Sequence, residues 1–418
     1  MKHSLLSLWL GGALLGLISA TTEAESLTLP QTLAAAWHYS AGLAASHNEA
    51  RALQTMAHSA RELPDPQLKF GLENLPVQGS NHRRVTREGM TMQRVGVMQR
   101  YVSREKRERK ALTLEAQAHS VTAQSAVIQA ALQRDAAGAW LELALSEKAL
   151  ATARRAVAET ARQQLAQTVS VSSGSAMPDS VPELQLTLSA LRDEVTQAGL
   201  DVQLARARLL QLTGEDVTAI AGALPPYQRL PADENTLRDG IVLHPEIIAA
   251  ARETETAKSR SAQSAIAAIP DVDVEIYYAH RAEGYDDMAG VMFTVDLPLF
   301  QSRRQDNDHA ADVSLAMQAN DRMAQITREH TAELSALIAR YQAAQTIWIR
   351  QRDDVVPVQQ RRLNLLMAQY RAGRSSLSSV LGARRDLLTS ELAANKAEKE
   401  LARSWAAIRW MIPQEITQ

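Results

Sequence analysis

The chain contains no cysteine among its 418 residues, which excludes disulfides, thiol nucleophiles, thiolate metal ligands and a lipid-modified N-terminal cysteine. Aromatic residues are also scarce, at 4% of the sequence with only three Phe. A large aromatic core, or a long transmembrane barrel made by one chain, is therefore not expected. Alanine and leucine fill the longest runs instead, and this composition favours long helices packed through small side chains.

An excess of charge of either sign is missing as well. The sequence has 45 Lys and Arg against 47 Asp and Glu, so its net charge of -2 gives no reason to expect a nucleic-acid partner. Beyond the N-terminus, no apolar stretch reaches the length of a transmembrane helix. If the protein enters a membrane, β-strands must therefore cross it.

Residues 1–24 have the pattern of a secretory signal peptide. Lys2 gives a basic start, an apolar segment runs from Leu5 to Ile18, and small residues follow as far as Ala24. Cleavage after Ala24 and cleavage after Ala20 both fit this pattern. The mature protein is expected to be exported from the cytoplasm.

The remaining sequence contains an internal repeat. Residues 64–75 and 270–278 both begin with Pro-Asp and continue as alternating, strand-like sequence, and the turns around Gly174 and Gly373 correspond to each other. We therefore divide the chain into a first repeat, 25–226, and a second repeat, 227–418. Each half is predicted to run as helix, two strands, long helix, turn and helix.

The predicted helices are unusually long. The sequence predicts helices over 30–63, 103–169, 182–212, 235–269, 302–371 and 375–411, with Ser103 as an N-cap and a Pro/Gly-rich connector over 213–233. At 1.5 Å per residue, the longest of them extend for roughly 100 Å. Helices of that length are far longer than a globular domain needs.

The four predicted strands, 67–75, 91–102, 271–279 and 289–298, have one apolar and one polar face. In the third strand, for example, Val274 and Ile276 alternate with Asp273 and Glu275. Strands of this length cross a bilayer when tilted, although a soluble sheet with one face on a core alternates in the same way. Two hairpins cannot close a barrel and lipid tolerates no open edge, so a membrane location requires an oligomer.

The paired repeats resemble the TolC-like outer-membrane efflux proteins, as do residues 237–246, 295–301 and 370–383. The resemblance implies a mainly α protomer with a small β part and a homotrimer with a twelve-stranded barrel in the outer membrane. It further implies a cylinder of helices across the periplasm. Such a duct is passive: it is not an enzyme, it holds no cofactor, and it works with a periplasmic adaptor and an inner-membrane RND pump.

Two segments, 63–76 and 90–99, resemble the heavy-metal, CzcC-like branch of that family. The branch implies heavy-metal cations as cargo. A TolC-like duct for drugs or peptides remains an alternative, as does a periplasmic coiled-coil adaptor protein. Adaptors, however, carry one helical hairpin per chain, surrounded by β-rich domains.

The resemblance also indicates a gate at the periplasmic tip, where family members carry two acids after the last turn. Ser379 and Gly382 occupy those positions here. Negative charge is instead expected from Asp179 and Glu183, with Arg374 pairing across a protomer boundary. Solvated turn residues explain these charges equally well. The gate candidates are Gly174, Asp179, Glu183, Gly373, Arg374, Ser379 and Gly382.

Inside the barrel, Asp273, Glu275 and Asp296 are expected to face the lumen, where they would favour cations or simply hold water. On this basis Arg should be tolerated at Glu275 but not at Ile276. The ten histidines lack metal-ligand spacing, so we expect them to be packed or on the surface. The sequence has no nucleophile elbow and no phosphate-binding loop, so no catalytic, metal or cofactor residue is predicted.

Overall fold

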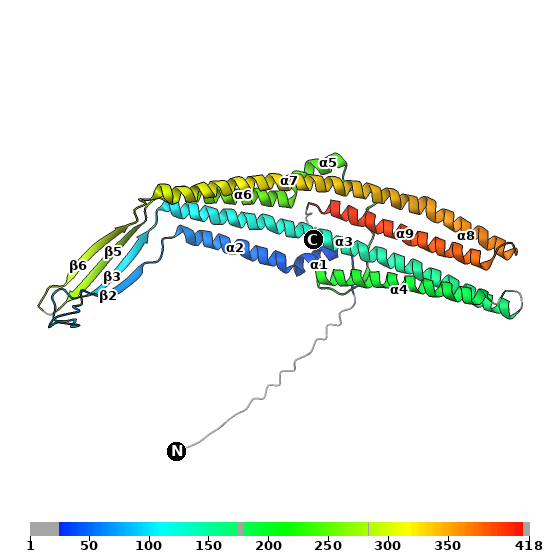
Figure 1. Cartoon of the computed structure of the whole chain (residues 1–418), viewed down its shortest axis with the longest axis horizontal. Coiled ribbons are helices and arrows are strands. Elements are labelled where there is room, and N and C mark those ends of the chain that lie inside the picture. Colours follow the sequence, from blue (N-terminus) through cyan, green and yellow to red (C-terminus); the bar gives the residue numbers. More distant parts are fainter. Residues whose placement is uncertain (1–24, 174–176, 178, 283, 413–418) are drawn as a thin grey trace, which may run out of the picture.

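The protein is described by a computed structural model that covers residues 25–173, 177, 179–282 and 284–412. The predicted signal peptide, residues 1–24, and Gly174 lie outside these residues. The described chain is elongated, with a four-stranded sheet at one end and helices running lengthwise to a tip at the other (Figure 1).

The first half follows the predicted order of elements. It contains β1 (Glu25–Leu27), α1 (Leu29–Tyr39), α2 (Ala41–Arg61), β2 (Gln67–Glu73), β3 (Met92–Tyr101), α3 (Arg104–Ser172) and α4 (Ser180–Thr213). Helix α3 is unbroken over 69 residues, which corresponds to about 100 Å. Ser103 caps it as predicted, since its hydroxyl accepts the Lys106 N–H at 3.3 Å.

The second half repeats this plan with more interruptions. After β4 (Val217–Ile220), which lies in the connector at the end of the first repeat, it contains α5 (Glu234–Asp239), a 3-10 turn (Gly240–Leu243), α6 (Pro245–Ser264), β5 (Val272–Arg281), β6 (Met288–Val295), a 3-10 turn (Gln301–Arg303), α7 (Gln305–Arg350), a π-helical turn (Gln351–Val355), α8 (Val356–Arg371) and α9 (Leu377–Arg409). In Figure 1, α6 and α9 follow one another along α7–α8 as α2 and α4 do along α3.

Three helices predicted as single elements are broken. Ser40 ends α1 and caps α2, with its hydroxyl accepting the Leu43 N–H at 3.3 Å. The predicted helix 235–269 is interrupted at His244, because His244 is the N-cap of a new helix, α6, that begins at Pro245. Helix α6 ends at Ser264, short of the predicted end. The predicted helix 302–371 widens into the π-helical turn just before Pro357, whose ring nitrogen cannot donate a helical hydrogen bond.

The sheet runs β2-β3-β5-β6 and is antiparallel throughout. Its register places Val97 opposite both Leu68 and Ile276, and Ile276 opposite Val291. The apolar side chains of all four strands therefore share one face, as the alternation predicted. Strands β2 and β6 form the two edges of the sheet.

A second, unpredicted pairing lies near the middle of the molecule. Within the Pro/Gly-rich connector, β4 pairs in parallel with β1. The largest buried side chains gather in the same region, including Trp140, whose indole N–H donates to the Leu27 carbonyl at 2.9 Å. This core joins the two halves of the chain at mid-length.

No described helix combines the length and the apolar character that crossing a membrane requires.

Candidate functional site

The apolar face of the sheet is open. Phe70, Ile276 and Phe293 are 83%, 64% and 67% exposed, and their neighbours Leu68, Val97 and Val291 are exposed too. None of the described helices covers these side chains, because all helices lie beyond the end of the sheet (Figure 1). A sheet in a soluble protein normally buries such a face on a core. An uncovered apolar patch of this kind indicates contact with another molecule or with lipid.

The opposite face carries an ordered set of ion pairs. One carboxylate oxygen of Glu275 accepts from Lys69 Nζ at 2.9 Å, and the other accepts from Arg94 Nη2 at 2.8 Å. Arg94 also donates to Glu73 at 2.7 Å. The Arg100 guanidinium donates to both carboxylate oxygens of Asp273, at 2.8 and 3.1 Å. These contacts cross-link strands from the two halves of the sequence.

Tyr277 lies along this polar face between two glycines. Arg94 sits over its ring, 3.7 Å from the centroid. A Cβ at Gly96 would lie 2.9 Å from Tyr277 Cβ, and one at Gly290 would lie 2.5 Å from the Tyr277 hydroxyl. The missing side chains at Gly96 and Gly290 therefore leave room for Tyr277 in its observed position.

The sequence-predicted lumen acids thus differ in their surroundings. Asp273 and Glu275 are neutralised by partners, whereas Asp296 lies exposed just past β6 and forms no ion pair with another described residue. These surroundings argue against the expectation that Arg is tolerated at Glu275. Glu275 is only 6% exposed, and an Arg there would add a third cation beside Lys69 and Arg94 while removing the acid that they share.

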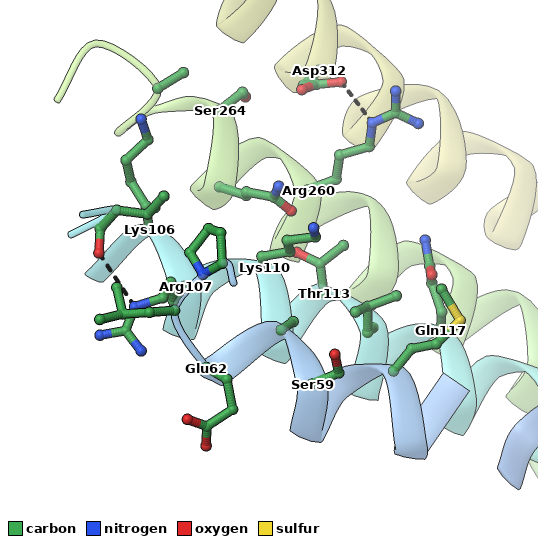
Figure 2. Close-up of a pocket in the computed structure, with 18 of the residues that line it drawn as sticks. Ser59, Glu62, Lys106, Arg107, Lys110, Thr113, Gln117, Arg260, Ser264 and Asp312 are labelled. Atoms are coloured by element: carbon green, nitrogen blue, oxygen red, sulfur yellow. Dashed lines mark hydrogen bonds and ion pairs between the residues drawn. The ribbon is translucent and has the colours of Figure 1, made fainter. Parts of the chain in front are cut away.

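A cavity of about 1120 Å³ lies where the helices meet the sheet, and Figure 2 shows the residues that line it. Helices α2, α3, α6 and α7 line it, and Arg260 pairs with Asp312 across it at 3.3 Å. Lys106, at its edge, bonds to Asp271 at 2.8 Å, and Asp271 continues the polar face of β5. The cavity is lined by both signs of charge, and Lys106 links its edge to the start of β5.

At the other end of the molecule, Gly373 makes the turn between α8 and α9. Its φ of 72° is left-handed, and the turn closes with Arg374 N–H donating to the Gln369 carbonyl at 2.8 Å. Glycine is the residue that adopts this helix-ending conformation without strain. Ser376 then caps α9, its hydroxyl accepting the Ser379 N–H at 3.1 Å.

The structure brings only some of the predicted gate residues together. Ser379 and Gly382 lie on one face of α9 and border a groove of about 690 Å³, and a Cβ at Gly382 would meet nothing within 4 Å. Asp179, Glu183 and Arg374 form no ion pair with one another or with any other described residue of the protomer. Pairing across a protomer boundary remains a prediction.

A hydrogen-bonded tie that the sequence analysis missed joins the two helical hairpins at the tip. The Tyr370 hydroxyl donates to Gln167 Oε1 at 3.1 Å, and Gln167 Nε2 donates to the Ser180 hydroxyl at 2.9 Å. Leu184, Leu377 and Leu381 form a small buried cluster against Tyr370. In the sequence, Gln167 resembles the glutamines beside it, and only its burial distinguishes it.

Two histidines form a buried stack near mid-length. The rings of His244 and His330 lie 3.8 Å apart, and the two ring nitrogens of His330 meet Glu246 at 2.8 Å and Glu333 at 3.0 Å. Burial, reinforced by the neighbouring His330, lowers the pKa of His244 from 6.5 to about 4. His244 Nδ1 accepts the Glu246 N–H, so its neutral ring serves as the cap of α6. The described residues contain no group of three or more His, Asp or Glu arranged to hold a metal.

No protein-family profile matches the chain. No curated protein matches it either. Solved structures do match over nearly the whole length. The chain is similar to the outer-membrane channel OprN, with 17% identity, a TM-score of 0.73, and coverage of 93% of this chain and 90% of that one. It is similar to CusC, described in a study of folding and transmembrane channel formation, with 14% identity, a TM-score of 0.75 and 92% coverage of both chains. VceC, an outer membrane protein of Vibrio cholerae, gives 16% identity, a TM-score of 0.72 and coverage of 92% and 96%. The chain therefore has the fold of the TolC-like outer-membrane channels.

Proposed function

We propose that this chain is one protomer of a homotrimeric outer-membrane duct that passively exports substrates. One observation carries the proposal: the sheet exposes a continuous apolar face and backs it with an ion-paired polar face. In a bilayer, the apolar side chains would contact lipid while the paired charges line an aqueous lumen. The similarity to channel folds supports the same assignment.

A trimer satisfies the sheet where a monomer does not. Strands β3 and β5, at 10 residues each, span about 25 Å of hydrocarbon when tilted, but the edges β2 and β6 leave backbone groups unpaired. Pairing β6 of one copy with β2 of the next would close the barrel and remove both edges. The repeats 25–226 and 227–418 would then contribute one hairpin each to every protomer.

The helices determine the rest of the architecture. Extending about 100 Å from the sheet, α3 would carry the duct across the periplasm towards a periplasmic adaptor and an inner-membrane RND pump. The Tyr370–Gln167–Ser180 tie would hold the two hairpins together when the tip is closed. Gly373, Arg374, Asp179 and Glu183 would lie at the entrance, with Gly174 beside them in the sequence.

For the cargo we propose heavy-metal cations, on the basis of segments 63–76 and 90–99. Because Asp273 and Glu275 are already paired, the lumen would let ions pass without holding them. Deletion of the gene should sensitise the source cells to zinc, cobalt or cadmium more than to drugs. Sensitivity to drugs or peptides alone would favour the other kinds of duct.

The mass of the purified full-length protein in detergent tests the assembly. Three protomers, together with ion conductance in planar bilayers, are expected. A detergent-independent, water-soluble protein without conductance would instead favour the periplasmic adaptor.

A further inference from the structure

The loop between β2 and β3, residues 74–91, is held in one shape by its own hydrogen bonds. Thr91 Oγ1 donates to the Asn74 carbonyl at 3.0 Å and ties the two ends of the loop together. Within the loop, Arg83 N–H donates to the Pro76 carbonyl at 2.9 Å, and Asn81 Nδ2 donates to Glu88 at 2.9 Å. The backbone from which the loop presents its side chains is therefore held in place.

The loop also rests on the neighbouring hairpin. Arg281 Nε donates to the Gly89 carbonyl at 2.7 Å, and Gly89 packs so closely on the Tyr285 ring that a Cβ would lie 2.5 Å from it. Arg281 itself lies over the same ring, 5.0 Å from its centroid. Both halves of the chain thus support the loop.

Three arginines on this loop, Arg83, Arg84 and Arg87, are exposed and form no ion pair with a described residue. The one acid within the loop, Glu88, is occupied by Asn81. This arrangement contrasts with the polar face of the sheet, where Arg94 and Arg100 are each paired. Unpaired guanidinium groups on one short loop are well suited to phosphate, which accepts their forked hydrogen bonds.

Apolar side chains accompany the arginines. Val77 is 74% exposed and Met90 63% exposed, and Val85 is exposed between them in the sequence. The loop that carries them lies at the end of the sheet away from the helices (Figure 1). A mixture of basic and apolar side chains at the edge of an apolar band is typical of a membrane–water interface.

We propose that the loop 74–91 binds the phosphate groups of a phosphorylated glycolipid in the outer leaflet, through Arg83, Arg84 and Arg87. The proposal rests on the proposed function, which places this end of the sheet at the cell surface and the helices in the periplasm. Phospholipids of the inner leaflet would lie at the opposite end of the strands, so the glycolipid is the phosphate source within reach.

The test uses the full-length trimer in detergent, with lipid A in mixed micelles as the probe. The variant Arg83→Gln, Arg84→Gln, Arg87→Gln should weaken binding of lipid A about tenfold or more. A control, Arg192→Gln, Arg229→Gln, Arg371→Gln, removes three exposed arginines from the helical part and connector and should bind as the wild type does.

Dephosphorylated lipid A and phosphatidylglycerol serve as further probes. Both should bind the wild type more weakly than lipid A. Equal binding of phosphatidylglycerol, undiminished binding without the phosphates, or equal losses in both triple variants would overturn the proposal. Mass and conductance of the same preparations show separately whether the protein is a trimeric channel, so failure of the loop site is distinguishable from failure of the duct.

Discussion

The two ends of the molecule hold their polar groups in different ways. At the sheet, Glu275 and Asp273 are locked to cationic partners on neighbouring strands. At the tip, the described hairpins are joined by the neutral Tyr370–Gln167–Ser180 tie and a few leucines, with one longer Arg384–Glu159 contact at 3.7 Å further along the helices. The nearby charges Asp179, Glu183 and Arg374 form no ion pair with another described residue.

In the proposed duct, this difference would match two mechanical roles. A rigid sheet beside lipid gains from cross-links that fix its register, since a register slip would turn every apolar side chain to the wrong face. A tip that must open gains from contacts that separate at modest cost, and single neutral hydrogen bonds contribute only about 0.5 to 1.5 kcal/mol each. Near mid-length the molecule holds a polar group in a third way, as the buried neutral side chain of His244.

The largest effect is expected at the sheet. Ile276→Arg places a charge on the apolar face and should oppose insertion by about 2 to 4 kcal/mol near the bilayer midplane. Met292→Arg is the matched control, because Met292 lies one residue along from the Val291 that faces Ile276, but on the polar face opposite Glu275. The yield of folded trimer in refolding into vesicles measures both. Equal yields would contradict the assignment of the two faces.

The buried histidine should make the middle of the molecule sensitive to pH. With a pKa of about 4 when folded and 6.5 when unfolded, His244 takes up its proton more readily in the unfolded chain. Stability is therefore unaffected above pH 6.5, falls as pH drops through this window, and is fully reduced below about pH 4. Between pH 8 and pH 5 the loss from this group should be about 2 kcal/mol.

The variant His244→Asn isolates that contribution, because Asn keeps an acceptor for the Glu246 N–H and does not titrate. Reversible urea unfolding of both proteins in detergent at pH 8 and pH 5 gives the comparison. The wild type should lose more stability than the variant on acidification. Equal losses of stability in the two proteins would mean that the pKa of His244 in the folded protein is not lowered.

A smaller effect is expected at the tip. Tyr370→Phe removes the hydroxyl that donates to Gln167 and should weaken the closed arrangement by about 1 kcal/mol, or roughly fivefold in the closed-to-open ratio. Single-channel recordings should then show more frequent opening. Tyr101→Phe makes the same change at an exposed tyrosine on β3, and should leave gating unchanged. Similar opening frequencies in both variants would show that the Tyr370–Gln167–Ser180 tie does not contribute to gating.

The smallest energies concern the charges at the entrance. Ser379→Asp with Gly382→Asp would place acids where the family carries them, and the space at Gly382 admits the side chain. Exposed charges contribute about 0 to 1 kcal/mol each, so folding should change little while block by divalent or trivalent cations increases. Thr389→Asp, further along α9, is the control. Strong block of the unmodified channel would contradict this view of the tip.

Much of the architecture followed from local sequence signals. The alternation in the strands, the cap at Ser103 and the glycine turn at Gly373 each depend on residues a few positions apart, and the structure has all three. The helix breaks at Ser40 and His244 also have local causes, in a cap residue and a following proline. They were missed because the alanine and leucine content on either side favours helix.

What the sequence by itself determined is therefore the order of elements, the two-sided strands and the duplicated plan. Only the tertiary structure decided which charges are neutralised and which residues join the hairpins. Glu275 meets Lys69 and Arg94, and Tyr370 meets Gln167, across gaps that span both halves of the chain. The physical reason is that such contacts depend on strand register and helix packing, which are fixed by the burial of the whole core and not by the residues that they bring together.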